Sequence, residues 1–176
     1  MTIHPPTSGF RAYPTEQAVA IIRAIAEHRW PMTINEAFTL RDQFGWRPAP
    51  DDGTIFTTPV SNGEEDGYIG NDVTDTSLVS RINFNLTTRL YSDAEPQIDH
   101  IIRSQYKAYV DALNSLYGQS SMESSAVGVL NVWNLRSRVS IVLGGTRRFI
   151  DVVIDSPAMM DLTEAEQRYF DEGGDL

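Results

Sequence analysis

The sequence predicts an α+β fold in which helices cover a single, mostly antiparallel sheet. Segments with the apolar spacing of helices are grouped apart from segments that alternate in steps of two, which is typical of this class. Three expected strands follow one another closely near the C-terminus, and no internal repeat or linker divides the 176 residues. We therefore expect one domain over residues 1–176, with an irregular N-terminal tail at 1–13 and the order α-α-β-β-α-β-β-β-α.

Apolar spacing and capping signals predict the first two helices. Thr15 is a suitable N-cap for a helix over 15–29, whose apolar stripe consists of Val19, Ile22, Ile25 and Ala26. Thr33 and Glu36 have the spacing of a capping box, which opens the second helix. Gly45 suits the left-handed position that follows a helix end.

Two strands are expected in the first half of the chain, a short one at 54–58 and a longer one at 78–90. The longer segment alternates, so that one face carries Leu78, Ser80, Ile82, Phe84 and Leu86. The other face carries Arg81, Asn83, Asn85 and Thr87. Between the two strands, residues 61–67 contain no apolar side chain and two glycines, which predicts an exposed, mobile loop.

The longest helix is predicted after residue 92. Ser92 and Glu95 form a second capping-box pattern, Pro96 suits the first turn, and Gly118 ends the apolar spacing. Strands are then expected at 127–133, 138–143 and 147–154.

Two further signals complete the C-terminal part of the prediction. Gly144 and Gly145 are interpreted as a two-residue hairpin turn between the last two strands. Thr163 and Glu166 predict a third capping box that opens a short terminal helix ending near Phe170.

Charge and composition narrow the classes of partner. The formal net charge is −10, which argues against nucleic acid and against anionic membrane surfaces as partners. The chain begins without a signal-peptide pattern and has no run of about 18 apolar residues, so we expect a cytoplasmic protein. The absence of cysteine excludes disulfides, thiolate metal sites and a cysteine nucleophile.

A search for catalytic patterns predicts neither an enzyme nor a cofactor or metal site. The three histidines, His4, His28 and His100, have no partner at a spacing that would place two ligands on one metal. No zinc-protease, phosphate-loop or serine-elbow pattern is present. The neighbouring carboxylates fall in predicted loops, where solvent leaves little scope for acid–base catalysis.

An acidic segment is the candidate partner-binding element. No Lys or Arg occurs from Pro48 to Ser80, whereas seven acidic residues do. Such a loop could enter a basic cleft and pair with arginines, with Tyr68 and Ile69 as an apolar anchor. The predicted contact residues are Asp51, Asp52, Glu64, Glu65, Asp66, Gly67, Tyr68, Ile69, Gly70, Asn71 and Asp72. The alternative is a solvated loop in an acidic protein.

Three runs carry a resemblance that covers most of the chain: "HRWPMTINEAFTLRDQFGWRP", "NDVTDTSLVSRINFNLTTRL" and "GVLNVWNLRSRVSIVLGGTRRFIDVVID". In these runs the sequence resembles the immunity factors of the tuberculosis necrotizing toxin, which are mycobacterial antitoxins. The resemblance implies a cytosolic protein that binds a cognate toxin domain, as a 1:1 heterodimer, and blocks its NAD glycohydrolase site. It assigns no individual residue a role.

The leading hypothesis is therefore an antitoxin that acts through surface and charge. A secretion-type chaperone or adaptor, which would hold a secreted partner without inhibiting it, is the alternative. A small-molecule-binding or catalytic domain is a third possibility, and it requires a concave pocket with convergent polar groups.

Overall fold

The computed structural model describes residues 9–174 and confirms the predicted α+β class. Over this range eight strands form one sheet in the order β1-β2-β3-β4-β8-β7-β6-β5, and every neighbouring pair is antiparallel. The strands are β1 (Arg47–Pro48), β2 (Ile55–Thr57), β3 (Gly67–Asn71), β4 (Val79–Asn85), β5 (Ser121–Ser124), β6 (Gly128–Asn134), β7 (Ser140–Thr146) and β8 (Ile150–Asp155). The helices are α1 (Thr15–Ala26), α2 (Ile34–Gln43), α3 (Pro96–Tyr117) and α4 (Pro157–Asp171).

Three short strands are additions to the predicted order. β1 has two residues including a proline, β3 contains two glycines, and all four residues of β5 are exposed. Each therefore lacks the run of alternating apolar residues by which a strand is recognised in a sequence. The helices nevertheless fall where the prediction places them, two before the first strands, one in the middle and one at the end.

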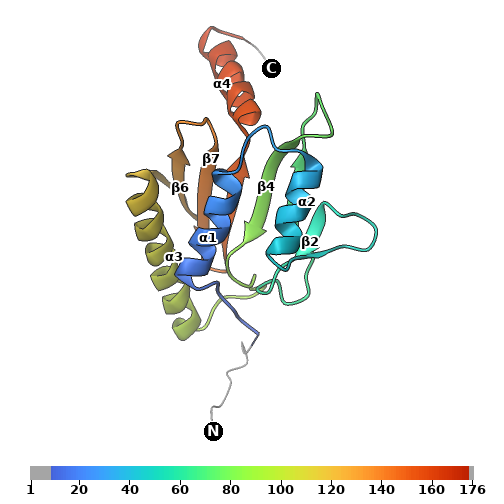
Figure 1. The fold of residues 1–176 in the computed structure, drawn as a ribbon. Coiled ribbons are helices and arrows are strands. Elements are labelled where there is room, and N and C mark those ends of the chain that lie inside the picture. Colours follow the sequence, from blue (N-terminus) through green and yellow to red (C-terminus); the bar gives the residue numbers. More distant parts are fainter. Residues whose placement is uncertain (1–8, 175–176) are drawn as a thin grey trace.

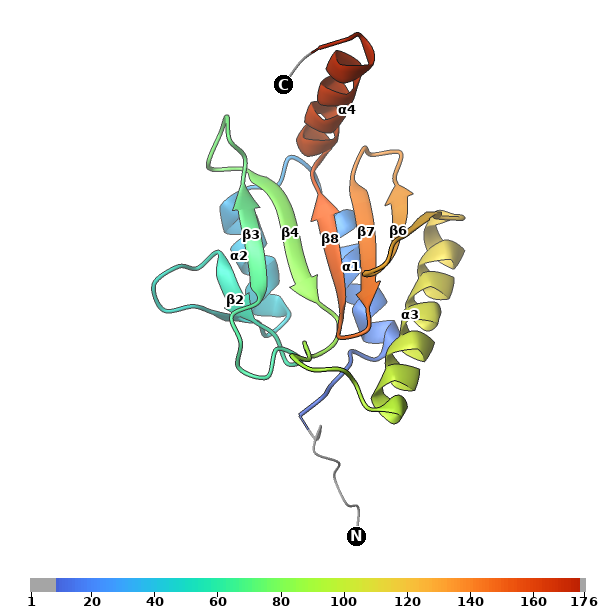
Figure 2. The same ribbon diagram turned by 180° about the vertical axis from the view of Figure 1, so that it is seen from behind.

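Helices cover one face of the sheet. Figure 1 shows α1 and α2 in front of the strands, and the reverse view in Figure 2 shows the strands in front of them. The face toward the helices has an apolar centre that is at most 2% exposed, with Ile82 and Phe84 on β4, Ile150, Val152 and Ile154 on β8, and Ile141 and Leu143 on β7. The alternation predicted for 78–90 is thus confirmed for Ile82, Phe84 and Leu86, which belong to the core, but the strand itself is shorter and ends at Asn85.

A buried tyrosine pair joins the N-terminal segment to α3. The Tyr109 hydroxyl donates to the Tyr13 carbonyl at 2.5 Å, and the Trp46 indole donates to the Tyr13 hydroxyl at 3.0 Å. Tyr13 is 2% exposed, and the preceding Ala12 forms a bridge with Thr87. Of the tail predicted at 1–13, residues 1–8 lie outside the described part of the chain.

The helix ends show which capping signals the fold uses. Thr33 and Glu36 form the predicted capping box, and Gly45 and Gly118 have the left-handed φ values of 74° and 90° expected after helix ends. The predicted N-cap at Thr15 is wrong, because Pro14 occupies that position and the Thr15 hydroxyl accepts instead from Gln105. The same helix ends at Ala26, three residues before its predicted end.

The other two predicted capping boxes are also wrong. Pro96 is the first residue of α3, so Glu95 is the N-cap and Ser92 lies outside the helix. α4 starts earlier than predicted because Ser156 accepts from the Met159 backbone N–H and Pro157 suits the first turn. Thr163 therefore lies inside α4, where its hydroxyl donates to the Met159 carbonyl.

The glycine pair of β7 is not the predicted hairpin turn. Gly144 and Gly145 lie within the strand, and the turn consists of Arg147 and Arg148, closed by the Thr146 N–H donating to the Phe149 carbonyl at 3.0 Å. The glycines are needed for close packing. A Cβ atom on Gly145 would lie 2.7 Å from the Tyr106 ring.

We predict that Gly145→Ala destabilises the protein through this contact. The Tyr106 hydroxyl donates to the Asn131 side chain at 2.6 Å and to the Leu143 carbonyl at 3.1 Å, so its ring cannot move away freely. The free energy of unfolding should fall by about 1–3 kcal/mol in urea denaturation. In a Tyr106→Ala background the same substitution should cost much less. An equal cost in both backgrounds would contradict this explanation.

Candidate functional site

The face of the sheet that α1, α2 and α3 leave uncovered is the candidate site. Figure 2 shows this face toward the viewer. Because side chains alternate along a strand, the residues between the core positions lie here. A row in register across five strands contains Val132, Val142, Val153, Asn83 and Tyr68. The three valines are half-buried and Tyr68 is 48% exposed, and solvent can reach these four side chains, which we call the apolar strip. Asn83 interrupts the strip between Val153 and Tyr68.

Next to this strip lies a cluster of four polar side chains, Asp66, Asn83, Asn85 and Asp151, which we call the carboxylate cluster. Asn85 on β4 is paired in register with Asp151 on β8. The Asn85 side chain donates to Asp66 at 3.1 Å, and the Ser61 hydroxyl donates to the other Asp66 oxygen at 2.5 Å. Asn85 thus bonds to the acid of the β2–β3 loop and lies beside the acid of β8.

Both carboxylates are partly removed from water. Burial raises the pKa of Asp151 to about 6, and this effect exceeds the opposing effects of hydrogen bonds from its own backbone and Asn83 and of the Arg89 charge. Burial also raises the pKa of Asp66, more than the hydrogen bond from Ser61 lowers it. Neither acid forms an ion pair within residues 9–174. Their negative charge is therefore available to a cation from outside.

Charged and polar groups border the site. Arg81 and Asp155 form an ion pair of 2.8 Å between β4 and β8. On the other side the Tyr91 hydroxyl donates to Glu64 at 2.7 Å. These contacts occupy Arg81 and leave the two acids of the carboxylate cluster without an ion pair among the described residues.

The acidic segment predicted as one cleft-facing loop is divided by the fold. β2 and β3 separate it into three loops, and the β2–β3 loop lies at the opposite end of these strands from the other two. Asp51 and Asp52 are in the β1–β2 loop, Glu64 and Glu65 are in the β2–β3 loop, and Asp72 follows β3. The segment therefore cannot enter a cleft as one element.

Several predicted contact residues already have partners within the chain. Asp52 accepts from the Thr54 backbone and hydroxyl, and Asp72 accepts from those of Thr74. These hydrogen bonds lower the pKa of both acids. The Asn71 side chain donates to the Thr76 carbonyl at 2.6 Å. The acids of the first and third loops thus stabilise turns.

Three predicted contact residues are buried. Ile69 is 1% exposed and belongs to the core, so its predicted role as an exposed anchor is wrong. Gly67 and Gly70 are buried strand residues, and a Cβ atom on Gly67 would lie 2.1 Å from the Phe56 ring. Tyr68, which points to the opposite face from Ile69, remains accessible.

Asp151, Asn83 and Asn85 were not predicted as site residues. A signal for them exists, because Asp151, Val153 and Asp155 alternate with three aliphatic residues and so share the face away from the core. The sequence does not show the strand register that places Asp151 opposite Asn85. It also does not show that the β2–β3 loop brings Asp66 to Asn85.

The chemistry of the arrangement is that of cation recognition. Two desolvated carboxylates beside an apolar strip suit a guanidinium or ammonium group carried on a protein surface. Over residues 9–174, no group of three or more His, Cys, Asp or Glu side chains is placed to hold a metal ion. Within the same range no helix has both the length and the apolar character to cross a membrane.

Residues 16–156 match a family described as a family of unknown function (DUF6301), and the chain belongs to this family. The matched region includes all four residues of the carboxylate cluster and the whole apolar row. Neither the curated proteins nor the solved structures give a match.

We predict that the Asp151 carboxylate lowers stability at neutral pH. Its pKa is about 6 in the folded protein and about 3.9 in an unfolded chain. The cost of the buried charge is therefore fully present above pH 6, decreases as the pH falls from about 6 to about 4, and is lost below the unfolded pKa, where both states are protonated. Asp151→Asn should raise the free energy of unfolding by roughly 1–3 kcal/mol at pH 7.5 and by little at pH 4.

Urea denaturation at several pH values measures this difference. The control is Asp51→Asn, because Asp51 is exposed and its replacement should change stability by no more than about 0.5 kcal/mol at any pH. A stability gain for Asp151→Asn that does not vary with pH would contradict the assignment of the raised pKa to this residue.

Proposed function

We propose that this member of the DUF6301 family is an antitoxin that binds a cognate NAD-hydrolysing toxin domain in the cytosol and blocks its active site. The observation that carries the proposal is the carboxylate cluster, Asp66 and Asp151 with their two asparagines, on a sheet face that the helices leave open. The binding surface we propose is this face with the neighbouring Glu64 and Glu65, in place of the acidic segment as a single loop.

The charge of the cluster supports a cationic target. An enzyme that binds NAD must hold a pyrophosphate, and arginine forks are well suited to that group. A carboxylate offers a guanidinium the same bidentate geometry. Asp66 and Asp151 are already partly desolvated, so pairing with such an arginine would add less desolvation cost than pairing with fully solvated acids.

The apolar strip supports a protein partner rather than a free ion. Val132, Val142 and Val153 lie side by side in register, and Asn83 separates them from Tyr68. A tyrosine at the centre of an interface contributes large contact area and a polar hydroxyl, which is why tyrosines are frequent among the residues that dominate binding. The net charge of −10 would also accelerate encounter with a basic partner.

Part of the proposed surface lies in the runs that resemble the immunity factors. Two of the three resembling runs, residues 71–90 and 128–155, contain Asn83, Asn85 and Asp151 together with all three valines of the strip. The proposed site is therefore built mainly from the part of the chain that carries the resemblance.

We predict that Tyr68→Ala and Asp151→Asn each weaken inhibition of the toxin. Wild-type protein should abolish NAD hydrolysis by the purified toxin domain at equimolar concentration. If Tyr68 and Asp151 are central contacts, each substitution should raise the inhibition constant about tenfold or more, because loss of a central contact costs roughly 2 kcal/mol. Calorimetry and an NAD-hydrolysis assay on the same samples measure binding and inhibition separately.

Leu116→Ala is the matched control, because Leu116 is an exposed apolar residue of α3 outside the proposed face. Its inhibition constant should equal that of the wild type. Unchanged inhibition by both Tyr68→Ala and Asp151→Asn would exclude this face. Tight binding with full toxin activity would exclude inhibition and indicate a chaperone or adaptor instead.

A further inference from the structure

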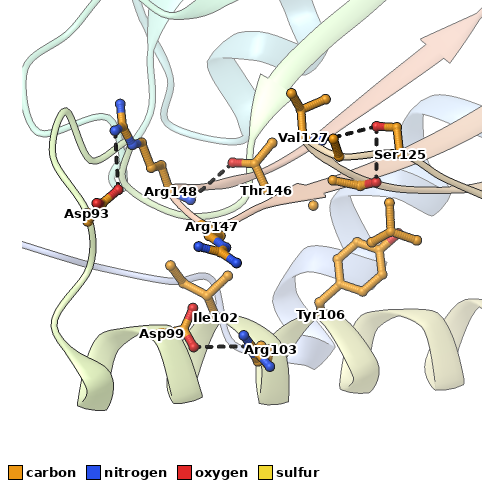
Figure 3. A pocket seen from close by; sticks show the side chains of 14 residues that line it. Asp93, Asp99, Ile102, Arg103, Tyr106, Ser125, Val127, Thr146, Arg147 and Arg148 are labelled. Carbon is orange, nitrogen blue, oxygen red and sulfur yellow. Dashed lines mark hydrogen bonds and ion pairs between the residues drawn. The ribbon is translucent and has the colours of Figure 1, made fainter.

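A separate cavity lies between α3, the tip of the β5–β6 hairpin and the β7–β8 turn. Its volume is about 800 Å³, within the usual range of small-molecule sites. Figure 3 shows its walls, with Ile102 and Tyr106 rising from α3 and Thr146 and Arg147 coming from the turn. Ser125 and Val127, at the hairpin tip, close the remaining side.

Three arginines and two aspartates, Asp93 and Asp99, line this cavity, so its lining has an excess of positive charge in a protein whose net charge is −10. Arg147 forms no ion pair with any residue from 9 to 174, and its side chain lies between the turn and Ile102 (Figure 3). Arg148 is 3.3 Å from Asp93, whose side chain is 90% exposed, so this pair contributes little stability. Arg103 is paired with Asp99 at 3.0 Å. The guanidinium of Arg147 is thus free to bind an anion, and that of Arg148 is easily released.

The other wall of the cavity is apolar. Ile102 on α3 faces Val127 and Val129 across the opening, and Val127 is 78% exposed. The Tyr106 hydroxyl is occupied by Asn131 and Leu143, so the tyrosine presents a fixed ring rather than a free donor. A ligand that fits must therefore combine an anionic group with an apolar or aromatic body.

We propose that this cavity binds a small organic phosphate, a phosphate monoester attached to an apolar or aromatic body. A carboxylate fills one arginine fork, whereas a phosphate has oxygens in three directions and about two negative charges. It can therefore contact Arg147 and Arg148 from the turn while also facing Arg103 on α3. The Thr146 hydroxyl accepts from the N–H groups of Arg148 and Phe149, which holds the turn in this orientation.

The source of the phosphate is a soluble molecule rather than a lipid headgroup. The acidic surface of the protein as a whole is repelled by anionic bilayers. The arginines also border one pocket between three elements, together with Asp93 and Asp99, and do not form a continuous basic surface.

The test uses phenyl phosphate as the probe and calorimetry on the full-length protein. Phenyl phosphate should bind, whereas inorganic phosphate and benzyl alcohol, which each lack one half of the probe, should bind at least about tenfold more weakly. Arg147→Gln should weaken phenyl phosphate binding roughly tenfold, because a hydrogen bond between charged groups is lost. Arg136→Gln, an exposed arginine in the β6–β7 turn outside the cavity, is the control and should bind as the wild type does.

Several outcomes would overturn this proposal. The first is that phenyl phosphate does not bind. The second is that Arg147→Gln binds phenyl phosphate as tightly as the wild type does. The third is that inorganic phosphate binds as tightly as phenyl phosphate. Sedimentation with vesicles containing phosphatidic acid that is lost in Arg147→Gln would assign the cavity to a lipid. Arg147→Gln should inhibit the toxin as strongly as the wild type does. A failure of the cavity proposal can therefore be distinguished from a failure of the proposed toxin-binding face.

Discussion

The strict alternation of side chains along β4, β8 and β7 is the constraint on which the rest of the structure depends. Apolar side chains occupy alternate positions at the centre of these strands and face the helices, where Ile82, Ile141 and Ile154 are at most 2% exposed. A shift of register by one residue would expose this entire set, so the register is strongly fixed. The same constraint delivers the intervening residues, including Asp151 and Asn83, to the opposite face. The core thus determines the composition of the proposed binding surface.

The uncovered face carries groups that packing alone does not explain. A carboxylate with a pKa near 6 at the centre of a sheet reduces the stability of the folded state at neutral pH. Buried charges that destabilise the folded state tend to mark functional positions. A site for a charged partner must carry its own charge before the partner binds. Burial also raises the pKa of Asp66, which accepts a hydrogen bond from Asn85, the residue beside Asp151.

Patterns within one segment predicted the fold class, the helices and the buried face of β4, because helix spacing and strand alternation are local properties. The short strands β1 and β5 escaped prediction because they depend on pairing with β2 and β6. Gly144 and Gly145 look like a turn in the sequence, but close contact with Asp151 and Tyr106 requires glycine there. The sequence predicts the acidic segment as one element, whereas β2 and β3 divide it into three loops. Only the register of β4 with β8 shows that Asp151 lies beside Asn85, the hydrogen-bond partner of Asp66.

The two proposed sites lie on opposite sides of the same segment of β7. A Cβ atom on Gly144 would meet Asp151 on the open face, and a Cβ atom on Gly145 would meet the Tyr106 ring that lines the arginine cavity. β7 is paired on both sides, with β6 and β8, and this makes the segment rigid. Charge can nevertheless act through it, since the Asp151 carboxylate contributes to the raised pKa of the Tyr106 hydroxyl. The carboxylate cluster and the arginine cavity are therefore linked electrostatically. Each site can keep its own geometry.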